Sequence, residues 1–326
     1  MGELRRIADY PALLDEAWAQ AHAPRAPDAP TVISTFAGCG GSSLGYHMAG
    51  FRELLAVEWE QNAADTFRLN FPRVPLYHGD IAKLSVEECL RLANVKPGEL
   101  DVFDGSPPCQ GFSTAGKRET GDARNQLFHE YCRLLRGLRP RAFVMENVSG
   151  MVKGDFKLVF AEIFRTLKGC GYRVKARLLN AQFFGVPQSR ERMIFVGIRE
   201  DIGREPSHPI GWSEPVPASS VHPHFSQILR SGARDNWCPA DTMFPTITKA
   251  ASTTSRTGYM SGGHFIRTRD DVERRPTLRE FQSLGSFPSP FAFAGTREDG
   301  VQRIGNSVPP LFMRSIATHV RDILGR

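Results

Sequence analysis

Apolar and polar positions follow two different periods along the chain from residue 31 onward. Residues 31–36 form a short apolar run, rich in β-branched side chains and ending at glycines, which is typical of a buried strand. Residues 127–138 repeat apolar side chains three and four positions apart, which is typical of an amphipathic helix. The same criteria predict further strands at 54–59, 75–80, 100–106, 142–148, 172–181 and 191–199, and further helices at 42–50, 62–71, 86–93 and 156–171.

This alternation of strands and helices predicts an α/β fold with a doubly wound, mostly parallel sheet. Ligands of such sheets bind at the carboxyl ends of the strands, so the loops that follow the strands are the places to look for chemistry. Asn62 and Ser85 stand at the starts of two predicted helices and are candidate N-caps.

The pattern also divides the chain into segments. The N-terminal extension combines a short amphipathic helix with the Pro-rich linker PRAPDAP. The regular alternation ends near residue 200, and the following stretch, rich in Pro, Ser, Gly, Thr and His, predicts an irregular inserted domain or a set of long loops. Regularity then returns and ends in an amphipathic helix at 311–325. The predicted segments are 1–30, 31–200, 201–272 and 273–326.

Composition narrows the class of protein. Of 326 residues, 41% are hydrophobic and 23% are charged, which excludes a disordered, collagen-like or coiled-coil chain. No apolar run reaches the ~18 residues of a membrane-spanning helix, and the N-terminus has no secretory signal. The net charge of +6 favours an anionic partner such as nucleic acid only weakly, because an ordinary soluble enzyme can carry the same charge.

The six cysteines are scattered, form no CxxC pair and show no zinc-finger spacing to a histidine. A disulfide framework is implausible in so large a chain without a signal peptide. We therefore expect reduced thiols, a cytoplasmic location and no metal.

A glycine-rich loop, FAGCGGSSLG, follows the first predicted strand. Gly38, Gly40 and Gly41 allow a tight turn and a close backbone approach to a ligand, and the next helix offers free N–H groups. The loop departs from the dinucleotide fingerprint because Ser43 replaces its third glycine. By itself, the loop is also compatible with a tight turn that binds nothing.

Polar residues at the next two strand ends point to the ligand of this loop. Glu58 ends the second strand and is placed to accept hydrogen bonds from ribose hydroxyls. Trp59 offers a ring face for adenine, and Asp80 ends the third strand, where it can accept the adenine amino group. Together they predict an adenosine-containing cofactor and leave NAD, FAD and S-adenosylmethionine open.

The loop after the fourth strand, FDGSPPCQGFS, contains a candidate nucleophile. Pro107 and Pro108 stiffen the backbone directly before Cys109, and a thiolate held at a strand end is well placed to attack a substrate. A lone loop cysteine is more often inert packing, but the neighbouring prolines and polar residues argue against burial. The polar, glycine-containing residues 113–126 predict a closing lid.

Three further charged residues complete the candidate site. Glu146 ends the fifth strand, where a partly desolvated carboxyl can donate a proton. Arg190 and Arg192 are two apart at the start of a later strand, so we expect them to share a face and bind a phosphate or a polar base edge. A surface ion pair with Glu191 is an equally good interpretation of this spacing.

These motifs, in this order, resemble the DNA (cytosine-5) methyltransferases of bacterial restriction–modification type. The resemblance covers residues 31–200 and 274–326. It rests on FAGCGG (36–41), GSPPCQGFS (105–113), ENV (146–148), QSRER (188–192), RRPTLREFQSLGSFP (274–288) and RIGNSVPP (303–310).

The resemblance implies a Rossmann-like S-adenosylmethionine-dependent fold and methyl transfer to C5 of a cytosine flipped out of a specific short sequence in double-stranded DNA. The Cys109 thiolate would add to C6, and C5 would then take the methyl group from S-adenosylmethionine, leaving S-adenosylhomocysteine. Glu146 would stabilise the adduct at N3, Arg192 would hold O2, and Arg190 would support the site. Loss of the C5 proton and of Cys109 would restore the aromatic ring.

The resemblance also assigns contacts residue by residue. Residues 201–272 correspond to the variable target-recognition region of the family. The implied DNA contacts are Gln110, Ser113, Lys117, Arg256, Arg267 and Arg269. The implied cofactor contacts are Phe36, Ala37, Gly38, Gly40, Gly41, Glu58, Trp59, Asp80, Ile81, Pro108, Leu127, Asn306 and Ser307.

The implied setting is the bacterial cytoplasm, in association with the nucleoid. The protein would act as a monomer on DNA, with any cognate restriction endonuclease acting separately. An RNA cytosine methyltransferase is the nearest alternative. A nicotinamide-dependent oxidoreductase would use the same first turn and Glu58, but it leaves Cys109 and the arginine pair unexplained. A catalytically silent DNA-binding protein is disfavoured because every residue needed for chemistry is present.

Overall fold

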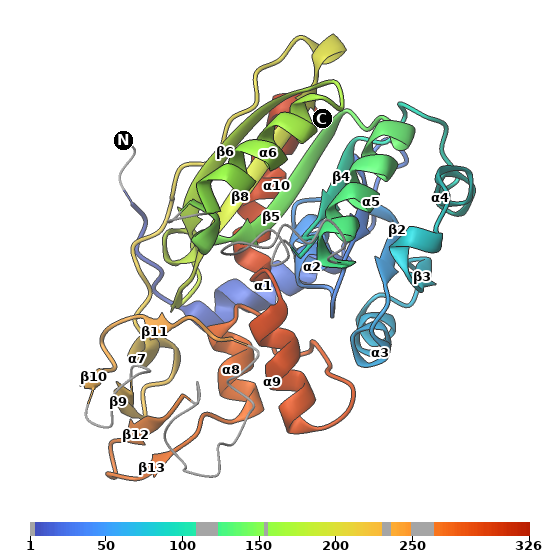
Figure 1. Ribbon diagram of the computed structural model, residues 1–326. Helices are drawn as coiled ribbons and strands as arrows, with labels where there is room; N and C mark the ends of the chain where they lie inside the picture. The colour runs from blue at the N-terminus through green and yellow to red at the C-terminus, as the bar shows by residue number, and fades with distance from the viewer. Residues whose placement is uncertain (1–3, 109–122, 153–155, 230–235, 249–263) are drawn as a thin grey trace.

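A computed structural model describes residues 4–108, 123–152, 156–229, 236–248 and 264–326. Its centre is a seven-stranded sheet in the order β3-β2-β1-β4-β5-β8-β6 (Figure 1). The strands are β1 (Thr31–Thr35), β2 (Arg52–Glu58), β3 (Leu76–His78), β4 (Val102–Gly105), β5 (Ala142–Val148), β6 (Tyr172–Asn180) and β8 (Glu191–Arg199).

The predicted mostly parallel sheet is confirmed. Strands β1 to β5 run parallel, whereas β8 pairs antiparallel with both β5 and β6. The reason is the connection: only residues 181–190 separate β6 from β8, too few for the crossover helix that a parallel neighbour requires.

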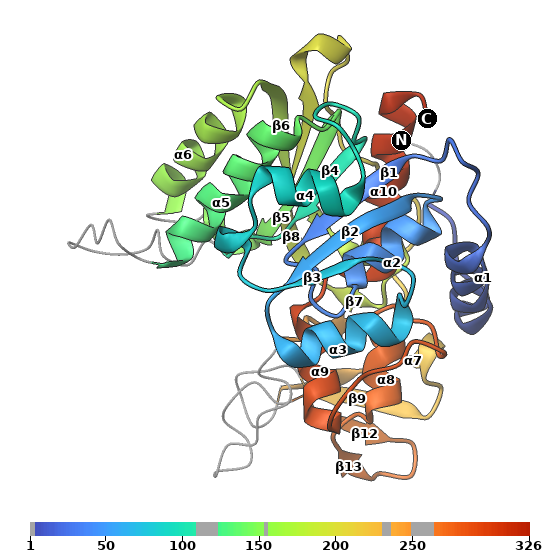
Figure 2. The same ribbon diagram turned by 90° about the vertical axis from the view of Figure 1, so that its right-hand side faces the viewer.

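Helices cover both faces of this sheet, as the doubly wound prediction requires (Figure 2). One face packs against α4 (Val86–Ala93), α5 (Ala123–Leu138) and α6 (Phe156–Lys168). The other face packs against α2 (Gly41–Met48) and α10 (Pro310–Leu324), with α1 (Tyr10–His22) lying outside on α2. Residues of one strand alternate between the two cores, because successive side chains point to opposite faces.

The two predicted helix caps have different outcomes. The prediction that Ser85 is an N-cap is confirmed, since its side chain accepts a hydrogen bond of 3.0 Å from the Glu88 N–H at the start of α4. The prediction that Asn62 is an N-cap is wrong, because α3 (Gln61–Asn70) begins one residue before Asn62 and Glu60 occupies the N-cap position. The Asn62 amide instead donates to the Ala294 carbonyl at 3.0 Å, which ties α3 to a distant loop.

A second, smaller group of elements lies below the central sheet in Figure 1. In the stretch for which the sequence predicts an irregular inserted domain or a set of long loops, the structure has a four-stranded antiparallel sheet in the order β10-β9-β12-β13, which favours the inserted domain. Its strands are only two to five residues long, which explains why the hydrophobic pattern shows no clear period there. These strands are β9 (Phe225–Leu229), β10 (Trp237–Pro239), β12 (Ile266–Thr268) and β13 (Glu273–Arg274).

Short elements join the two parts of the molecule. We call the four-stranded sheet β10-β9-β12-β13 and its connecting segments the small lobe. Strand β7 (Gln188–Ser189) pairs with β11 (Phe244–Pro245), so the start of β8 is connected to the small lobe. Helix α7 (Ala218–Val221) precedes the small sheet, and the chain returns after it through α8 (Leu278–Leu284) and α9 (Arg297–Asn306). None of the helices within the described ranges is long and apolar enough to span a membrane.

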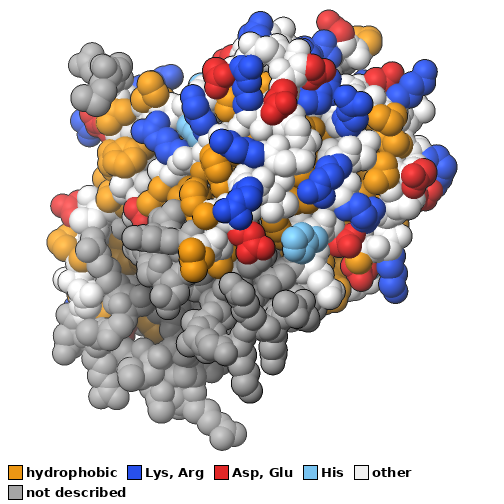
Figure 3. All heavy atoms as spheres, turned by 45° about the horizontal axis from the view of Figure 1, so that its top comes forward, with side chains coloured by type: hydrophobic (Ala, Val, Ile, Leu, Met, Phe, Trp, Pro, Cys, Tyr) orange, Lys and Arg blue, Asp and Glu red, His pale blue; other side chains and the backbone are white. Residues whose placement is uncertain are grey.

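On the face shown in Figure 3, Lys and Arg side chains outnumber Asp and Glu and are interspersed with them. The excess agrees with the formal net charge of +6. In the part of this face that the structure describes, basic and acidic side chains are mixed rather than separated into patches.

Candidate active site and cofactor cavity

A cavity of about 740 Å³ lies at the carboxyl ends of the parallel strands. Its walls come from the loops after β1 to β4, from α5 and from the end of α9. Every implied cofactor contact except Gly40 lines this cavity. The structure thus brings together residues from widely separated motifs, because parallel strands present their carboxyl ends at one edge.

Gly40 serves the turn rather than the cavity wall. It caps α2 with a φ of +96°, in the left-handed region that favours glycine. A Cβ added here would lie 2.3 Å from Cε2 of Phe71 at the end of α3. Glycine is therefore required at this position by backbone conformation and packing.

Glu58 is the most constrained polar group of the cavity. One carboxylate oxygen accepts the Gly38 N–H at 2.7 Å, and the other accepts the N–H groups of Trp59 and Glu60, both at 2.8 Å. The carboxylate is buried and fixed in direction, and it retains lone pairs for a ligand. This is the environment expected of a group that binds a pair of hydroxyls.

Trp59 and Asp80, which follow β2 and β3, differ in how far their side chains are already engaged. Trp59 is 75% exposed and presents its ring at the cavity. Asp80 uses one oxygen to accept the Ala82 N–H at 2.9 Å, which caps the short helix after β3. An exposed aromatic ring in a cavity wall that also carries two carboxylates suits an aromatic base with a sugar attached.

The cavity is also lined by residues that the sequence analysis did not assign to the cofactor. Cys39, Glu60 and Arg303 are three of them. Burial raises the pKa of Cys39 to about 11, so this thiol stays neutral, and its Sγ lies 3.0 Å from Oγ of Ser307. Arg303 forms an ion pair with Glu60. Arg303 lies within the quoted motif RIGNSVPP, but nothing in the sequence indicates its partner.

The structure describes the approach to the candidate nucleophile. Cys109, Gln110, Ser113 and Lys117 lie outside the described residues. Directly before them, the Pro107 carbonyl accepts a hydrogen bond of 3.0 Å from the Asn147 side chain.

Asn147 is buried at the end of β5, and its own oxygen accepts the Val148 N–H at 2.8 Å. The ENV motif therefore contributes a second residue to the candidate site that the sequence analysis missed, because Asn147 ties β5 to the segment leading to Cys109.

Glu146 and Arg192 form an ion pair of 2.7 Å between Oε1 and Nε. Their side chains are 11% and 14% exposed. Arg192 also donates to the main-chain oxygen of Glu191 at 2.7 Å. The alternative of a surface ion pair between Arg192 and the Glu191 side chain is therefore wrong.

Arg190 has other partners than Arg192, and it lies just before β8, which begins at Glu191. That the two side chains share a face stays a prediction. Arg190 is fully buried and donates to the carbonyls of Ile247 and Gly305 at 2.9 and 3.1 Å. Burial lowers the pKa of its guanidinium to about 9. It anchors the segment that leads to Asn306.

The implied DNA contacts lie on the small lobe or outside the described residues. Arg256 belongs to the second group. The Arg267 guanidinium lies 4.6 Å from the Trp237 ring centroid and donates to the Gln227 side chain at 2.9 Å. It also pairs with Asp271 and Glu273 at 3.5 and 3.7 Å. Arg267 is thus held by its own sheet.

Arg269 follows β12 and is exposed, and its main-chain N–H donates to the His224 carbonyl at 2.9 Å. Nothing in the structure identifies the bases that either arginine would contact, so both assignments stay predictions.

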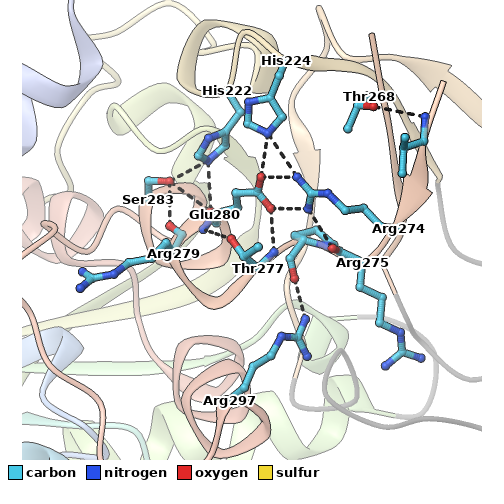
Figure 4. Close-up of polar contacts among 12 residues, drawn as sticks. His222, His224, Thr268, Arg274, Arg275, Thr277, Arg279, Glu280, Ser283 and Arg297 are labelled. Atoms are coloured by element: carbon cyan, nitrogen blue, oxygen red, sulfur yellow. Dashed lines mark hydrogen bonds and ion pairs between the residues drawn. The ribbon is translucent and has the colours of Figure 1, made fainter. Parts of the chain in front are cut away.

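His222, His224 and Glu280 bring possible metal-binding atoms within 4.8 Å of one another (Figure 4). However, Arg274 already donates to both Glu280 oxygens, at 2.7 and 2.8 Å. Arg274 supplies the positive charge that a cation would bring. The cluster is better described as a joint between the small sheet and α8.

Comparison with known proteins identifies the family to which the chain belongs. The model of the C-5 cytosine-specific DNA methylases matches residues 30–232 and 218–322. Type II methyltransferase M1.HphI of Haemophilus parahaemolyticus is 35% identical over 327 residues, covering 89% of this chain and 86% of its own. M.NgoPII of Neisseria gonorrhoeae is 30% identical and covers 90% and 96%. The fold resembles that of a Spodoptera frugiperda DNMT2 variant, with a TM-score of 0.69, 19% identity, and 91% and 100% coverage.

Proposed function

Because the chain belongs to the C-5 cytosine-specific DNA methylases, which methylate cytosine in DNA, we propose that its methyl donor is S-adenosylmethionine and its target a flipped-out cytosine within a specific short sequence of double-stranded DNA. The observation that carries this proposal is the Glu146–Arg192 pair beside the segment leading to Cys109. The adjoining cavity supplies a place for the donor.

The cavity fits S-adenosylmethionine. Its volume of about 740 Å³ lies in the range of sites that enclose a ligand of this size. Glu58 offers a carboxylate already fixed by three N–H groups to the ribose hydroxyls, and Trp59 offers a face to adenine. When bound, the cofactor supplies an electrophilic methyl group.

Cys109 is the proposed nucleophile. Its thiolate forms a bond to C6 of the cytosine, which increases the electron density at C5. After C5 has gained the methyl group, its proton is lost and the S–C6 bond breaks, which restores the aromatic ring. Asn147 contributes by holding the Pro107 carbonyl, so that the backbone before Cys109 has a fixed position.

Glu146 and Arg192 bind the cytosine edge in this proposal. Glu146 hydrogen-bonds or protonates N3, and Arg192 holds O2. Their ion pair is formed before substrate arrives, so both groups are already oriented and partly desolvated. Arg190 supports the site by anchoring Gly305, directly before Asn306, through two hydrogen bonds to its carbonyl.

Attack on C6 requires access to the face of the ring, which is covered in a stacked duplex. The cytosine must therefore leave the stack, at a cost of a few kcal/mol. We propose that the enzyme acts as a cytoplasmic, nucleoid-associated monomer. Any cognate restriction endonuclease would act separately.

Covalent trapping tests this function. The protein is mixed with S-adenosylmethionine and a randomised duplex pool containing 5-fluorocytosine, which blocks the final elimination. We expect an adduct stable to denaturing electrophoresis that requires the cofactor and disappears in Cys109→Ser. Sequencing the trapped DNA gives the target. An adduct with transfer RNA but none with duplex DNA would contradict the proposal.

A further inference from the structure

The cofactor cavity has an uneven charge. Four carboxylates line it, those of Glu58, Glu60, Asp80 and Glu130, whereas Arg303 is the single Lys or Arg among the described lining residues. Such a cavity favours a cationic ligand, and a change of one charge in its wall alters that preference. The position of Arg303 is therefore of particular interest.

Arg303 is paired across the cavity wall with Glu60. Arg303 comes from α9 and Glu60 from the turn between β2 and α3, two segments 243 residues apart in sequence. The arginine side chain is 3% exposed and that of Glu60 is 44% exposed. The two charges of this ion pair therefore compensate each other within the cavity wall that Glu58 and Trp59 also line.

The Arg303 side chain is 3% exposed, so it offers little surface to a ligand. Its Nε is buried and has no hydrogen-bond partner among the described residues. A buried donor without a partner costs free energy, so hydrogen bonding alone does not account for an arginine here. Its positive charge, however, acts through space on any charged group in the cavity.

We propose that Arg303 and Glu60 act with opposite sign on the selectivity of the cavity between S-adenosylmethionine and S-adenosylhomocysteine, so that each residue balances the effect of the other. The inference rests on the proposed donor. The two ligands differ by a methyl group and by the positive charge of the sulfonium. Arg303 opposes that charge and Glu60 favours it, so the intact pair leaves the selectivity nearly unchanged and loss of either partner shifts it.

The test is the ratio of two dissociation constants, Kd for S-adenosylhomocysteine over Kd for S-adenosylmethionine, measured by calorimetry. Arg303→Gln makes the cavity more negative, so we expect the ratio to rise about three- to tenfold. Glu60→Gln makes it less negative, so the ratio should fall by a similar factor. The double variant restores the net charge and should return the ratio to within about twofold of wild type.

A purely structural role gives a different result. A substitution that only loosens the cavity would raise the dissociation constants of both ligands by the same factor. The ratio would then stay constant, which would overturn the inference. Arg303→Lys retains the charge and should keep the wild-type ratio. Glu88 and Arg91 form an exposed ion pair on α4 away from the cavity, so Arg91→Gln is the matched control and should not change the ratio.

The experiment distinguishes a failure of the inference from a failure of the variant to fold and from a failure of the proposed function. If Arg303→Gln does not fold, the half-exposed Glu60→Gln variant still carries the test. If the wild-type protein binds neither ligand, the proposed donor fails together with the inference. If it binds both ligands and neither single variant moves the ratio, the inference alone fails.

Discussion

Arg192 lies 2.7 Å from Glu146, on the neighbouring antiparallel strand. The register places Arg192 opposite Val148, two residues from Glu146, so the two side chains are diagonal neighbours on one face of the sheet. β-Sheet geometry thus fixes the distance between the two charges. Neither group has to be recruited by a loop movement when the substrate arrives.

Removing the Glu146 carboxyl should therefore impair chemistry more than cofactor binding. For Glu146→Gln we expect kcat to fall about 10²- to 10⁴-fold, the usual contribution of a positioned acid or base. Transfer of a labelled methyl group to duplex DNA measures turnover, and calorimetry measures cofactor affinity. Exposed Glu191 provides the matched control, since Glu191→Gln should remain active. Near-normal turnover in Glu146→Gln would exclude this role.

Asn147 should act through the nucleophile loop. Asn147→Ala removes the hydrogen bond to the Pro107 carbonyl, so the backbone before Cys109 loses a fixed point. We expect adduct formation on 5-fluorocytosine DNA to slow about tenfold or more, because misplacement by about 1 Å is costly. Cofactor affinity should remain unchanged. Equal losses in adduct rate and cofactor affinity would instead indicate general disorder of the site.

Glu58 should govern cofactor affinity. In Glu58→Gln the amide group faces the backbone N–H donors that the carboxylate now accepts, and one charge is lost. Since hydrogen bonds to charged groups contribute about 1.5–3 kcal/mol, we expect Kd for S-adenosylmethionine to rise about tenfold or more. Glu87→Gln, an exposed change on α4, is the control. An unchanged Kd would remove Glu58 from the binding site.

Much of this arrangement was predictable because it depends on local sequence and on one rule of topology. Glu58 and Asp80 each follow a predicted strand, and parallel strands place such residues at a common edge. Thr31–Thr35 and Ala142–Val148 were recognisable from their apolar runs. The cavity at the carboxyl ends therefore follows from residues visible in the sequence.

The remaining features depend on contacts between distant segments. Glu60 and Arg303 are ordinary charged residues until the return of the chain places α9 beside the β2–α3 turn. Arg190 bonds to the carbonyls of Ile247 and Gly305, which are 57 and 115 residues away in sequence, so the local spacing does not reveal its partners. The strands of the small lobe are too short to generate a period.

Gly40 provides a test of the turn that shapes the cavity. Gly40→Ala would put a Cβ 2.3 Å from the Phe71 ring at a φ of +96°. Left-handed strain and overpacking together should lower the free energy of unfolding by roughly 2 kcal/mol or more. Thermal unfolding without ligand measures this effect. Gly150→Ala, where a Cβ meets nothing within 4 Å, is the control, and equal stability of the two variants would contradict the argument.

Glu280 should make the joint between α8 and the small sheet sensitive to acid. Burial alone would raise the pKa of this carboxyl, but hydrogen bonds from Arg274, the Thr277 N–H and His224 lower it from 4.5 to about 2. A carboxyl with a depressed folded-state pKa stabilises the protein above its unfolded-state value. This stabilisation is lost as the pH falls from about 4.5 through about 2.

Glu280→Gln measures that contribution directly. The substitution leaves Arg274, which is 32% exposed, without its charged partner. We expect the free energy of unfolding at pH 7 to fall by about 2 kcal/mol, less than for a fully buried pair because water still reaches the guanidinium. Denaturant titrations of both proteins between pH 7 and pH 3 should show the difference shrinking below about pH 4.5, since wild-type Glu280 then gains its proton on unfolding. A difference that stays constant over this range would show that the carboxylate charge does not stabilise the joint.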